Sequence, residues 1–227
     1  LEGRSLIVVT GPGRSGTSAV ARVLHESGLR MGTEFSPPSE YNPVGFYEDM
    51  PVRELNEQIM ADCGMDGLDR WPEREDVRRA AEPYASAMAA LAATGVDGWK
   101  DPRFCITLEA WLPHLAASPC VVVCLRSPEA FIHSVVSIFG LRPRDTLERW
   151  WANHLRRALD VVREYHLPAT SVVYEDLVAR PEATVDRLAS FVGQPLDARF
   201  IEPALRQFDQ PVPERHRSLY EEVRALS

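Results

Sequence analysis

Several features that would place this 227-residue chain in other protein classes are missing from it. No apolar run approaches the ~20 residues of a membrane-spanning helix. The first apolar stretch, Leu6–Val9, is too short for a signal peptide. There is no repeat or low-complexity tract, and 45% of the residues are hydrophobic, which excludes a disordered or fibrous chain. The sequence therefore predicts a soluble, cytoplasmic protein with a single globular domain over residues 1–227.

Lysine is nearly absent. Of the 25 basic residues Lys100 is the only lysine, and all the others are arginines. The net charge is −8 and the isoelectric point is near 5.3, so we expect no broad basic face for nucleic acid or for an acidic membrane. This charge balance still permits a local anion site, and the single lysine is a candidate for chemistry that arginine performs less well.

Cysteine is scarce, with four residues in no metal-binding or redox spacing. Cys120 and Cys124 lie four positions apart in an apolar run, so on a strand both face the same side. We expect four buried free thiols in a reducing compartment, and no metal site.

The remaining pattern alternates short apolar runs with helical segments. Strands are expected at Ser5–Val9, Leu29–Met31, Cys120–Leu125 and Thr170–Tyr174, with a short one ending at Trp99–Lys100. Helices are expected at Thr17–Ser27, Glu48–Asp62, Glu75–Ala93, from Pro128 after the cap Ser127, from Asp145 to Tyr165, and at Pro181–Val192. This alternation predicts an α/β fold with a P-loop-like central parallel sheet flanked by helices. Ligands bind such folds beyond the carboxyl ends of the strands.

A glycine-rich loop follows the first expected strand and has the sequence GPGRSGTS, Gly11–Ser18. Its glycines, Gly13 and Gly16 included, permit a tight turn, and the helix that follows presents free amides and a positive dipole end to an anion. Ser15, Thr17 and Ser18 add hydroxyl groups, and Arg14 adds a charged fork. Thr17 stands where a Walker A loop has its lysine, which disfavours ordinary triphosphate chemistry. We therefore predict a phosphate cradle.

Other polar residues follow the later strands. Arg126 ends one strand, and Ser134 lies ~9 Å along the next helix, so the two could hold one anion. Tyr174 ends another strand. Lys100 ends a third strand, before Asp101-Pro102.

These motifs resemble the sulfotransferase family that uses 3′-phosphoadenosine-5′-phosphosulfate (PAPS). Arg14–Ser18 matches the [KR]-[ST]-G-[ST]-[ST] loop for the 5′-phosphosulfate. Asn42–Glu48 and Trp99–Arg103 match N-P-x-G-[FY]-[WYF]-E and W-K-D-P-R of bacterial sulfotransferases, and the R-S-G-T and K-D-P elements also occur in tyrosylprotein sulfotransferases. The resemblance implies the sulfotransferase fold, with Arg126 and Ser134 at the 3′-phosphate and Tyr174 near the adenine.

The resemblance also assigns catalytic roles. Lys100 would stabilise the moving sulfuryl group and the leaving oxygen, and Arg14 would assist at the 5′-phosphate. The K-T-H motif that carries the histidine base of many cytosolic sulfotransferases is absent, because Asp101 and Pro102 occupy its places. Tyrosylprotein and several bacterial sulfotransferases use a glutamate as the general base, and the resemblance makes Glu48 or Glu34 the candidate here, with Glu48 slightly favoured because it ends a family motif.

The sequence thus predicts transfer of the sulfuryl group of PAPS to a hydroxyl, or less readily an amine, of a small molecule or saccharide, with release of 3′,5′-adenosine bisphosphate. Two rival interpretations are a divergent P-loop kinase of a small molecule and a non-catalytic nucleotide-binding module. The acceptor contacts are expected from the Thr33–Phe46 loop and from the helices around Trp71 and Trp150. Arg215–Arg217 could add charge near the 3′-phosphate, but a solvated face is the favoured interpretation.

Overall fold

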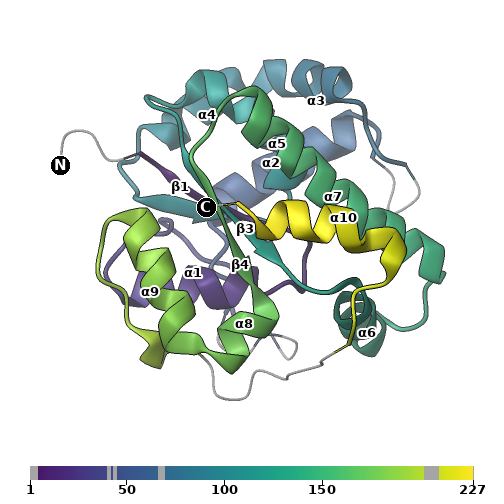
Figure 1. Cartoon of the computed structure of the whole chain (residues 1–227). Coiled ribbons are helices and arrows are strands. Elements are labelled where there is room, and N and C mark those ends of the chain that lie inside the picture. Colours follow the sequence, from purple (N-terminus) through teal and green to yellow (C-terminus); the bar gives the residue numbers. More distant parts are fainter. Residues whose placement is uncertain (1–4, 40–41, 43–44, 66–69, 202–209, 227) are drawn as a thin grey trace.

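A computed structural model describes residues 5–39, 42, 45–65, 70–201 and 210–226 (Figure 1). Within these residues the strands are β1 (Ile7–Thr10), β2 (Gly98–Lys100), β3 (Cys120–Leu125) and β4 (Ala169–Val173). They form one parallel sheet in the order β2-β1-β3-β4. The expected α/β fold with a central parallel sheet is confirmed.

Helices surround the sheet on both faces (Figure 1). They are α1 (Thr17–Glu26), α2 (Met50–Asp62), α3 (Arg74–Ala81), α4 (Ala85–Ala92), α5 (Phe104–Trp111), α6 (Pro128–Phe139), α7 (Arg144–Glu164), α8 (Tyr174–Ala179), α9 (Pro181–Val192) and α10 (Glu214–Arg224). Short 3₁₀ helices cover Glu82–Tyr84, Leu112–His114 and Ala198–Phe200.

Alternate strand residues build two separate apolar clusters, one on each face of the sheet. Ile7, Val9 and Val122 join the cluster covered by α1, α8 and α9. Val8 and Val121 join the larger cluster, to which α2, α3, α5, α6, α7 and α10 contribute. Because both faces are covered, the strands are continuously apolar in sequence, which is typical of a parallel sheet.

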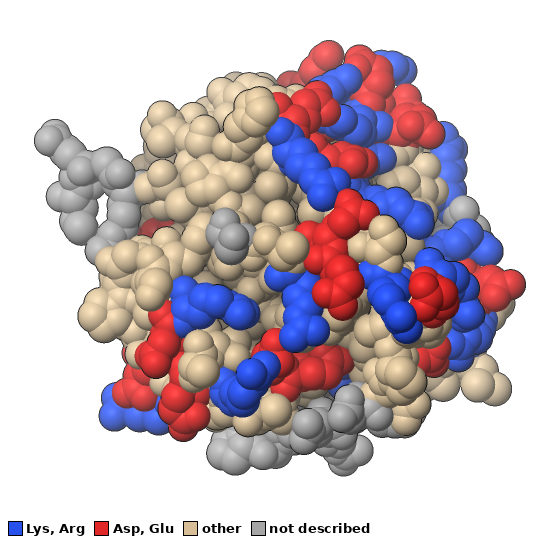
Figure 2. All heavy atoms as spheres, in the orientation of Figure 1, with Lys and Arg blue, Asp and Glu red and all other residues tan. Residues whose placement is uncertain are grey.

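Ion pairs join the helices of the larger layer. Arg74 on α3 bonds Glu109 on α5 at 2.6 Å and Glu164 on α7 at 2.5 Å. On the face seen in Figure 2, basic and acidic side chains lie beside one another over this region. These ion pairs connect α3, α5 and α7. Because basic side chains lie beside acidic ones there, the described residues form no patch of a single charge over this region (Figure 2).

Several expected elements differ from the structure. Leu29–Met31 is not a strand: Leu29 and Met31 are buried, but backbone pairing is limited to Arg30, whose carbonyl accepts from the amides of Asp97 and Gly98. The expected helix Glu75–Ala93 is interrupted by the 3₁₀ turn Glu82–Tyr84, because Pro83 lacks an amide and clashes with the preceding turn.

The long helix begins one residue earlier than expected, at Arg144, and Asp145 lies inside its first turn instead of capping it. Glu148 binds side chains of Arg144 and Arg215 instead of closing a capping box. The Ser127 cap is confirmed, since its side chain accepts from the amide of Ala130. All four cysteines are free, as expected, but Cys120 at the start of β3 is only partly buried.

Candidate active site

The loop Gly11–Ser18 joins the end of β1 to the start of α1 and needs two of its glycines for steric reasons. A Cβ on Gly11 (φ +136°) would lie 2.3 Å from the carbonyl oxygen of Cys124, and one on Gly16 (φ +88°) would lie 2.8 Å from the ring of Tyr174. Gly13 has no neighbour within 4 Å of such a Cβ and no positive φ, so this position does not require glycine for space. The loop therefore packs its backbone directly against the ends of β3 and β4.

The hydroxyl groups of the loop lie at the start of α1, where no side chain caps the helix. Ser15 and Thr17 are buried, and the Ser15 hydroxyl has no hydrogen-bond partner in the described structure. A buried hydroxyl without a partner, next to uncapped amides, provides the donors that a phosphate or sulfate group accepts.

Arg14, Ser134, Arg126 and Tyr174 lie together at the ends of β1, β3 and β4. Arg14 Nε donates to Ser134 Oγ at 3.3 Å, and Arg126 Nη1 donates to the carbonyl oxygen of Arg14 at 3.0 Å. The guanidinium of Arg126 also lies over the Tyr174 ring, 4.1 Å from its centroid. The sequence predicted two separate anchor positions, and the structure brings them into direct contact.

This group has positive charge in excess. Burial and the neighbouring Arg126 lower the pKa of Arg14, and burial lowers the pKa of Arg126. Arg126 Nε is buried without a hydrogen-bond partner in the described structure. Two adjacent, partly buried guanidinium groups are stabilised by an anion between them, so these residues fit a bound phosphate.

Lys100 ends β2 beside the loop and is 1% exposed. Its Nζ donates to Glu48 Oε1 at 2.8 Å and to Ser18 Oγ at 3.3 Å. The single lysine, a hydroxyl of the loop and one of the two candidate bases therefore meet at one point.

The carboxylate of Glu48 faces two more cations, Arg53 of α2 and Arg103, each 3.7 Å from Oε2. Burial raises the pKa of Glu48, but Lys100, Arg103 and Arg53 outweigh it and hold the pKa below its ordinary value. Burial lowers the pKa of Lys100, and Glu48 opposes that shift. Glu48 is therefore an ionised carboxylate at neutral pH.

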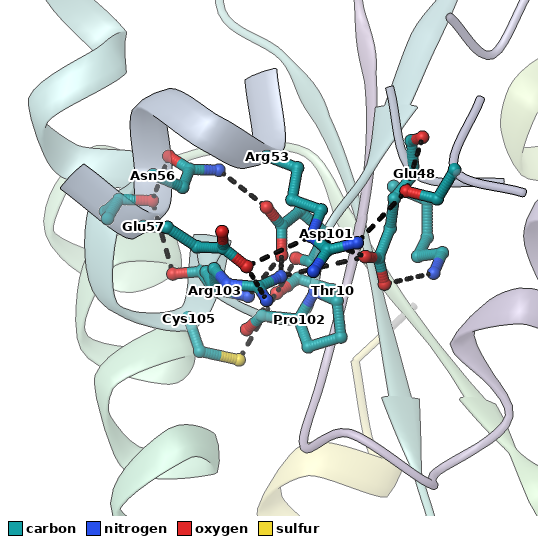
Figure 3. A network of polar contacts seen from close by, with 12 residues as sticks. Thr10, Glu48, Arg53, Asn56, Glu57, Asp101, Pro102, Arg103 and Cys105 are labelled. Atoms are coloured by element: carbon teal, nitrogen blue, oxygen red, sulfur yellow. Dashed lines mark hydrogen bonds and ion pairs between the residues drawn. The ribbon is translucent and has the colours of Figure 1, made fainter. Parts of the chain in front are cut away.

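The residues that follow Lys100 in sequence, Asp101–Arg103, are held by a network of polar contacts (Figure 3). Asp101, 1% exposed, accepts from Arg103 Nη1 and from Asn56 Nδ2, both at 2.9 Å. Asn56 Oδ1 in turn accepts from Thr107 and Trp111 at 2.8 Å. Sequence reasoning did not single out Asn56, although it is a polar residue on the buried face of α2.

Glu34, the other candidate base, is exposed, and its carboxylate makes no hydrogen bond or ion pair with the described residues. Its backbone is nevertheless held to the Glu48 segment. The Asp49 side chain accepts from the Glu34 amide at 3.0 Å, and the Glu34 carbonyl accepts from the Met50 amide at 2.7 Å. The structure thus brings Glu48 to Lys100 and places Glu34 nearby on the surface. Pro43 and Val44, within the motif that ends at Glu48, lie outside the described residues.

Weaker candidates are placed elsewhere. Arg215 and His216 were expected on a solvated face, but both bind Glu148 of α7, and His216 is buried. Trp150 packs edge-on against Phe131 and His154. The described residues contain no group of three or more His, Cys, Asp or Glu placed to hold a metal ion. No helix in the described part of the chain combines the length and apolar character needed to cross a bilayer.

Comparison with known proteins identifies the family of the chain. The profile of the sulfotransferase family matches residues 6–198. No curated protein matches the chain.

Two solved structures are similar in fold. The sulfotransferase domain from the curacin biosynthetic pathway is 18% identical, with a TM-score of 0.52, over 100% of this chain and 93% of that one. The sulfotransferase domain from the Synechococcus PCC 7002 olefin synthase is 18% identical, with a TM-score of 0.52, over 100% of this chain and 90% of that one. At this identity the likeness concerns the fold.

Proposed function

Because the chain belongs to the sulfotransferase family, we propose that it transfers the sulfuryl group of PAPS to a hydroxyl, or less readily an amine, of a small molecule or saccharide. The observation that carries this proposal is the buried Lys100 ammonium group, which contacts both Ser18 of the phosphate loop and Glu48. We further propose that the chain works as one cytoplasmic domain.

The donor would be held at its two anionic ends. The 5′-phosphosulfate would lie on the amides and hydroxyl groups of Gly13–Ser18, with the unpartnered Ser15 hydroxyl among its donors. The 3′-phosphate would lie between Arg126 and Ser134, and the adenine would lie near Tyr174. Support for this placement comes from the excess positive charge of the Arg14–Arg126 group.

In the reaction, the acceptor oxygen forms a bond to sulfur as the bond between sulfur and the bridging oxygen of the 5′-phosphate breaks. The acceptor proton passes to a carboxylate, and the leaving oxygen keeps the electron pair, which yields the sulfated acceptor and 3′,5′-adenosine bisphosphate. Lys100 and Arg14 would stabilise the negative charge that develops on the leaving oxygen and on the sulfuryl oxygens. Thr17, in the place of a Walker lysine, fits a donor that needs no triphosphate clamp.

We assign the general base to Glu48, because it is ionised, buried and in contact with Lys100. Proton transfer requires that the base lie within hydrogen-bond reach of the acceptor, and Glu48 borders the same ammonium group that would hold the sulfuryl oxygens. Glu34 is the alternative. Turnover by Glu48→Gln and Glu34→Gln variants decides between them, since loss of the true base should lower kcat by about 10²–10⁴-fold and leave a measurable residual rate.

Binding and turnover test the function together. Calorimetry with 3′,5′-adenosine bisphosphate should show binding that Arg126→Gln weakens at least about 10-fold, since a charge-assisted hydrogen bond contributes about 1.5–3 kcal/mol. The matched control is Arg217→Gln, on an exposed side chain paired with Glu214. Release of the bisphosphate from PAPS, with a panel of hydroxyl acceptors, measures the chemistry.

Each rival function gives a different result. Tighter binding of ATP–Mg²⁺ than of the bisphosphate, with ATP turnover, would establish the kinase. Binding of the bisphosphate without any release from PAPS would establish a non-catalytic nucleotide-binding module.

A further inference from the structure

Tyr47 stands directly before Glu48 and has a backbone conformation that tyrosine rarely adopts. Its φ is +56°, in the left-handed region, where the Cβ of an L-residue crowds the following carbonyl oxygen. Among the described non-glycine residues only Arg14 and His166 also have a positive φ. Gly45, two residues earlier, has a φ of +94°, and glycine takes such a conformation without crowding. Glycine would suit position 47 equally well, which points to a role for the tyrosine side chain.

That side chain is anchored on the C-terminal turn of α1. The Tyr47 hydroxyl donates to Glu26 Oε1 at 2.9 Å. Its ring lies 5.5 Å from the ring of Phe35 and 5.7 Å from that of His25, and these two rings meet edge-on at 4.9 Å. Two aromatic contacts and a hydrogen bond therefore hold the strained residue in place.

The side chain of Glu48 is held at a different place, against Lys100 of β2. Its backbone is fixed as well: the Glu48 carbonyl accepts from the Ser36 amide at 3.0 Å, and Asp49 pairs with Phe35 in an antiparallel bridge. Tyr47 therefore links two fixed points: its own side chain is anchored on α1, and the carboxylate of the next residue, Glu48, lies in the candidate site. A change in its φ would rotate the chain just before Glu48 and move the carboxylate relative to Lys100.

We propose that Tyr47 is a positioning residue, whose aromatic anchor maintains a left-handed turn that aims the Glu48 carboxylate at Lys100 and at the acceptor. The inference rests on the proposed function, because it gives Glu48 the role of base. The proposal adds a residue that does not touch Lys100 or the reacting groups. Tyr47 influences the reaction through the backbone, by setting the position of Glu48.

Turnover in a double-mutant cycle tests the coupling. Tyr47→Ala should lower kcat by up to about 100-fold, as expected when a reacting group is misplaced by about 1 Å, with little change in acceptor KM. Tyr47→Phe, which keeps the ring, should retain most of the activity. In a Glu48→Gln background, Tyr47→Ala should cause no further loss, because Tyr47 acts only through Glu48. The matched control is His166→Ala, a replacement at another positive-φ residue, which should leave kcat unchanged.

A second readout does not depend on turnover. The Glu48 carboxyl can be titrated by ¹³C NMR in the wild-type protein and in Tyr47→Ala, and its pKa should rise in the variant as its contacts with Lys100, Arg53 and Arg103 loosen. If Tyr47→Ala does not fold, Phe35→Leu removes one of the two rings that hold the Tyr47 ring and should raise the pKa in the same direction.

The outcomes separate the two claims. A loss of kcat that adds to that of Glu48→Gln, or a rise confined to KM, would show that Tyr47 contacts the acceptor and would overturn the inference while the sulfotransferase function stands. An unchanged Glu48 pKa in both variants would also overturn it. A raised pKa in a protein that does not turn over PAPS would uphold the positioning and refute the proposed function.

Discussion

Replacing Lys100 by methionine removes the ammonium group and keeps most of the side-chain volume. Glu48, 7% exposed, then loses its 2.8 Å partner, and among the described residues it keeps Arg53 and Arg103, each at 3.7 Å. Breaking a buried ion pair costs about 3–5 kcal/mol, and we expect about 3 kcal/mol here because the two arginines still offset part of the lost charge. Turnover of PAPS should fall by about 10²–10³-fold, as for the loss of one group that stabilises the transition state.

The stability loss should depend on pH with a definite sign. In the wild-type protein the low pKa of Glu48 contributes stability above about pH 4.5, which is lost as the pH falls through the folded pKa. Without Lys100 the burial of Glu48 raises its pKa relative to the wild-type protein. The difference between the two proteins should therefore be largest at neutral pH. It should shrink as the pH falls, first as Glu48 of the variant is protonated and then, below about pH 4.5, as Glu48 of the wild-type protein is protonated.

The assays are urea denaturation at pH 7 and pH 4, calorimetry with 3′,5′-adenosine bisphosphate, and single-turnover kinetics. Adding Glu48→Gln to Lys100→Met should recover part of the stability, because no unpaired carboxylate remains, but none of the turnover. Equal losses of turnover and of nucleotide affinity would refute the catalytic role of Lys100. A Lys100→Met protein as stable as the wild type at pH 7 would refute the buried ion pair.

Two further predictions follow from particular side chains. Gly16→Ala places a Cβ 2.8 Å from Tyr174 at a φ of +88°, so it should lower the free energy of unfolding measured by urea denaturation by about 2 kcal/mol and should also weaken nucleotide binding. Gly13→Ala, with no protein atom within 4 Å of the added Cβ, should leave the free energy of unfolding unchanged. Burial lowers the pKa of His154 from 6.5 to about 4, against the opposing Trp150 carbonyl, so the stability of the protein should rise with pH between these values by about 3 kcal/mol in total. His154→Gln should flatten that part of the stability–pH curve; a curve with the wild-type slope would show that another group causes it.

Much of the fold could be predicted because the apolar runs are continuous and their ends are marked. Cys120–Leu125 and Pro181–Val192 have the expected bounds, since Ser127-Pro128 and Gly193 give local signals of a helix start and a helix end. The prediction of a strand at Leu29–Met31 was wrong. Hydrophobicity predicts that these residues are buried, whereas a strand also needs hydrogen bonds to a neighbouring backbone along its length. The sequence cannot supply that information.

In the candidate site, too, the sequence identified individual residues but not the contacts between them. Motif spacing singled out Arg14, Lys100 and Arg126, because each lies at a strand end or in a loop whose chemistry is local. Spacing could not show that Arg126 contacts Arg14, or that Lys100 binds Glu48 and not Glu34, since these contacts join segments far apart in sequence. The aromatic anchor of Tyr47 and the Asn56 network depend on tertiary packing in the same way.

The burial of the only lysine has a practical consequence for spectroscopy. A protein prepared with ¹⁵N-labelled lysine carries one labelled ammonium group, and that group lies between Ser18 and Glu48. The ammonium resonance needs no assignment, because the sequence contains no second lysine. Titrations with nucleotides or acceptor candidates can therefore be followed at this one atom from the first experiment.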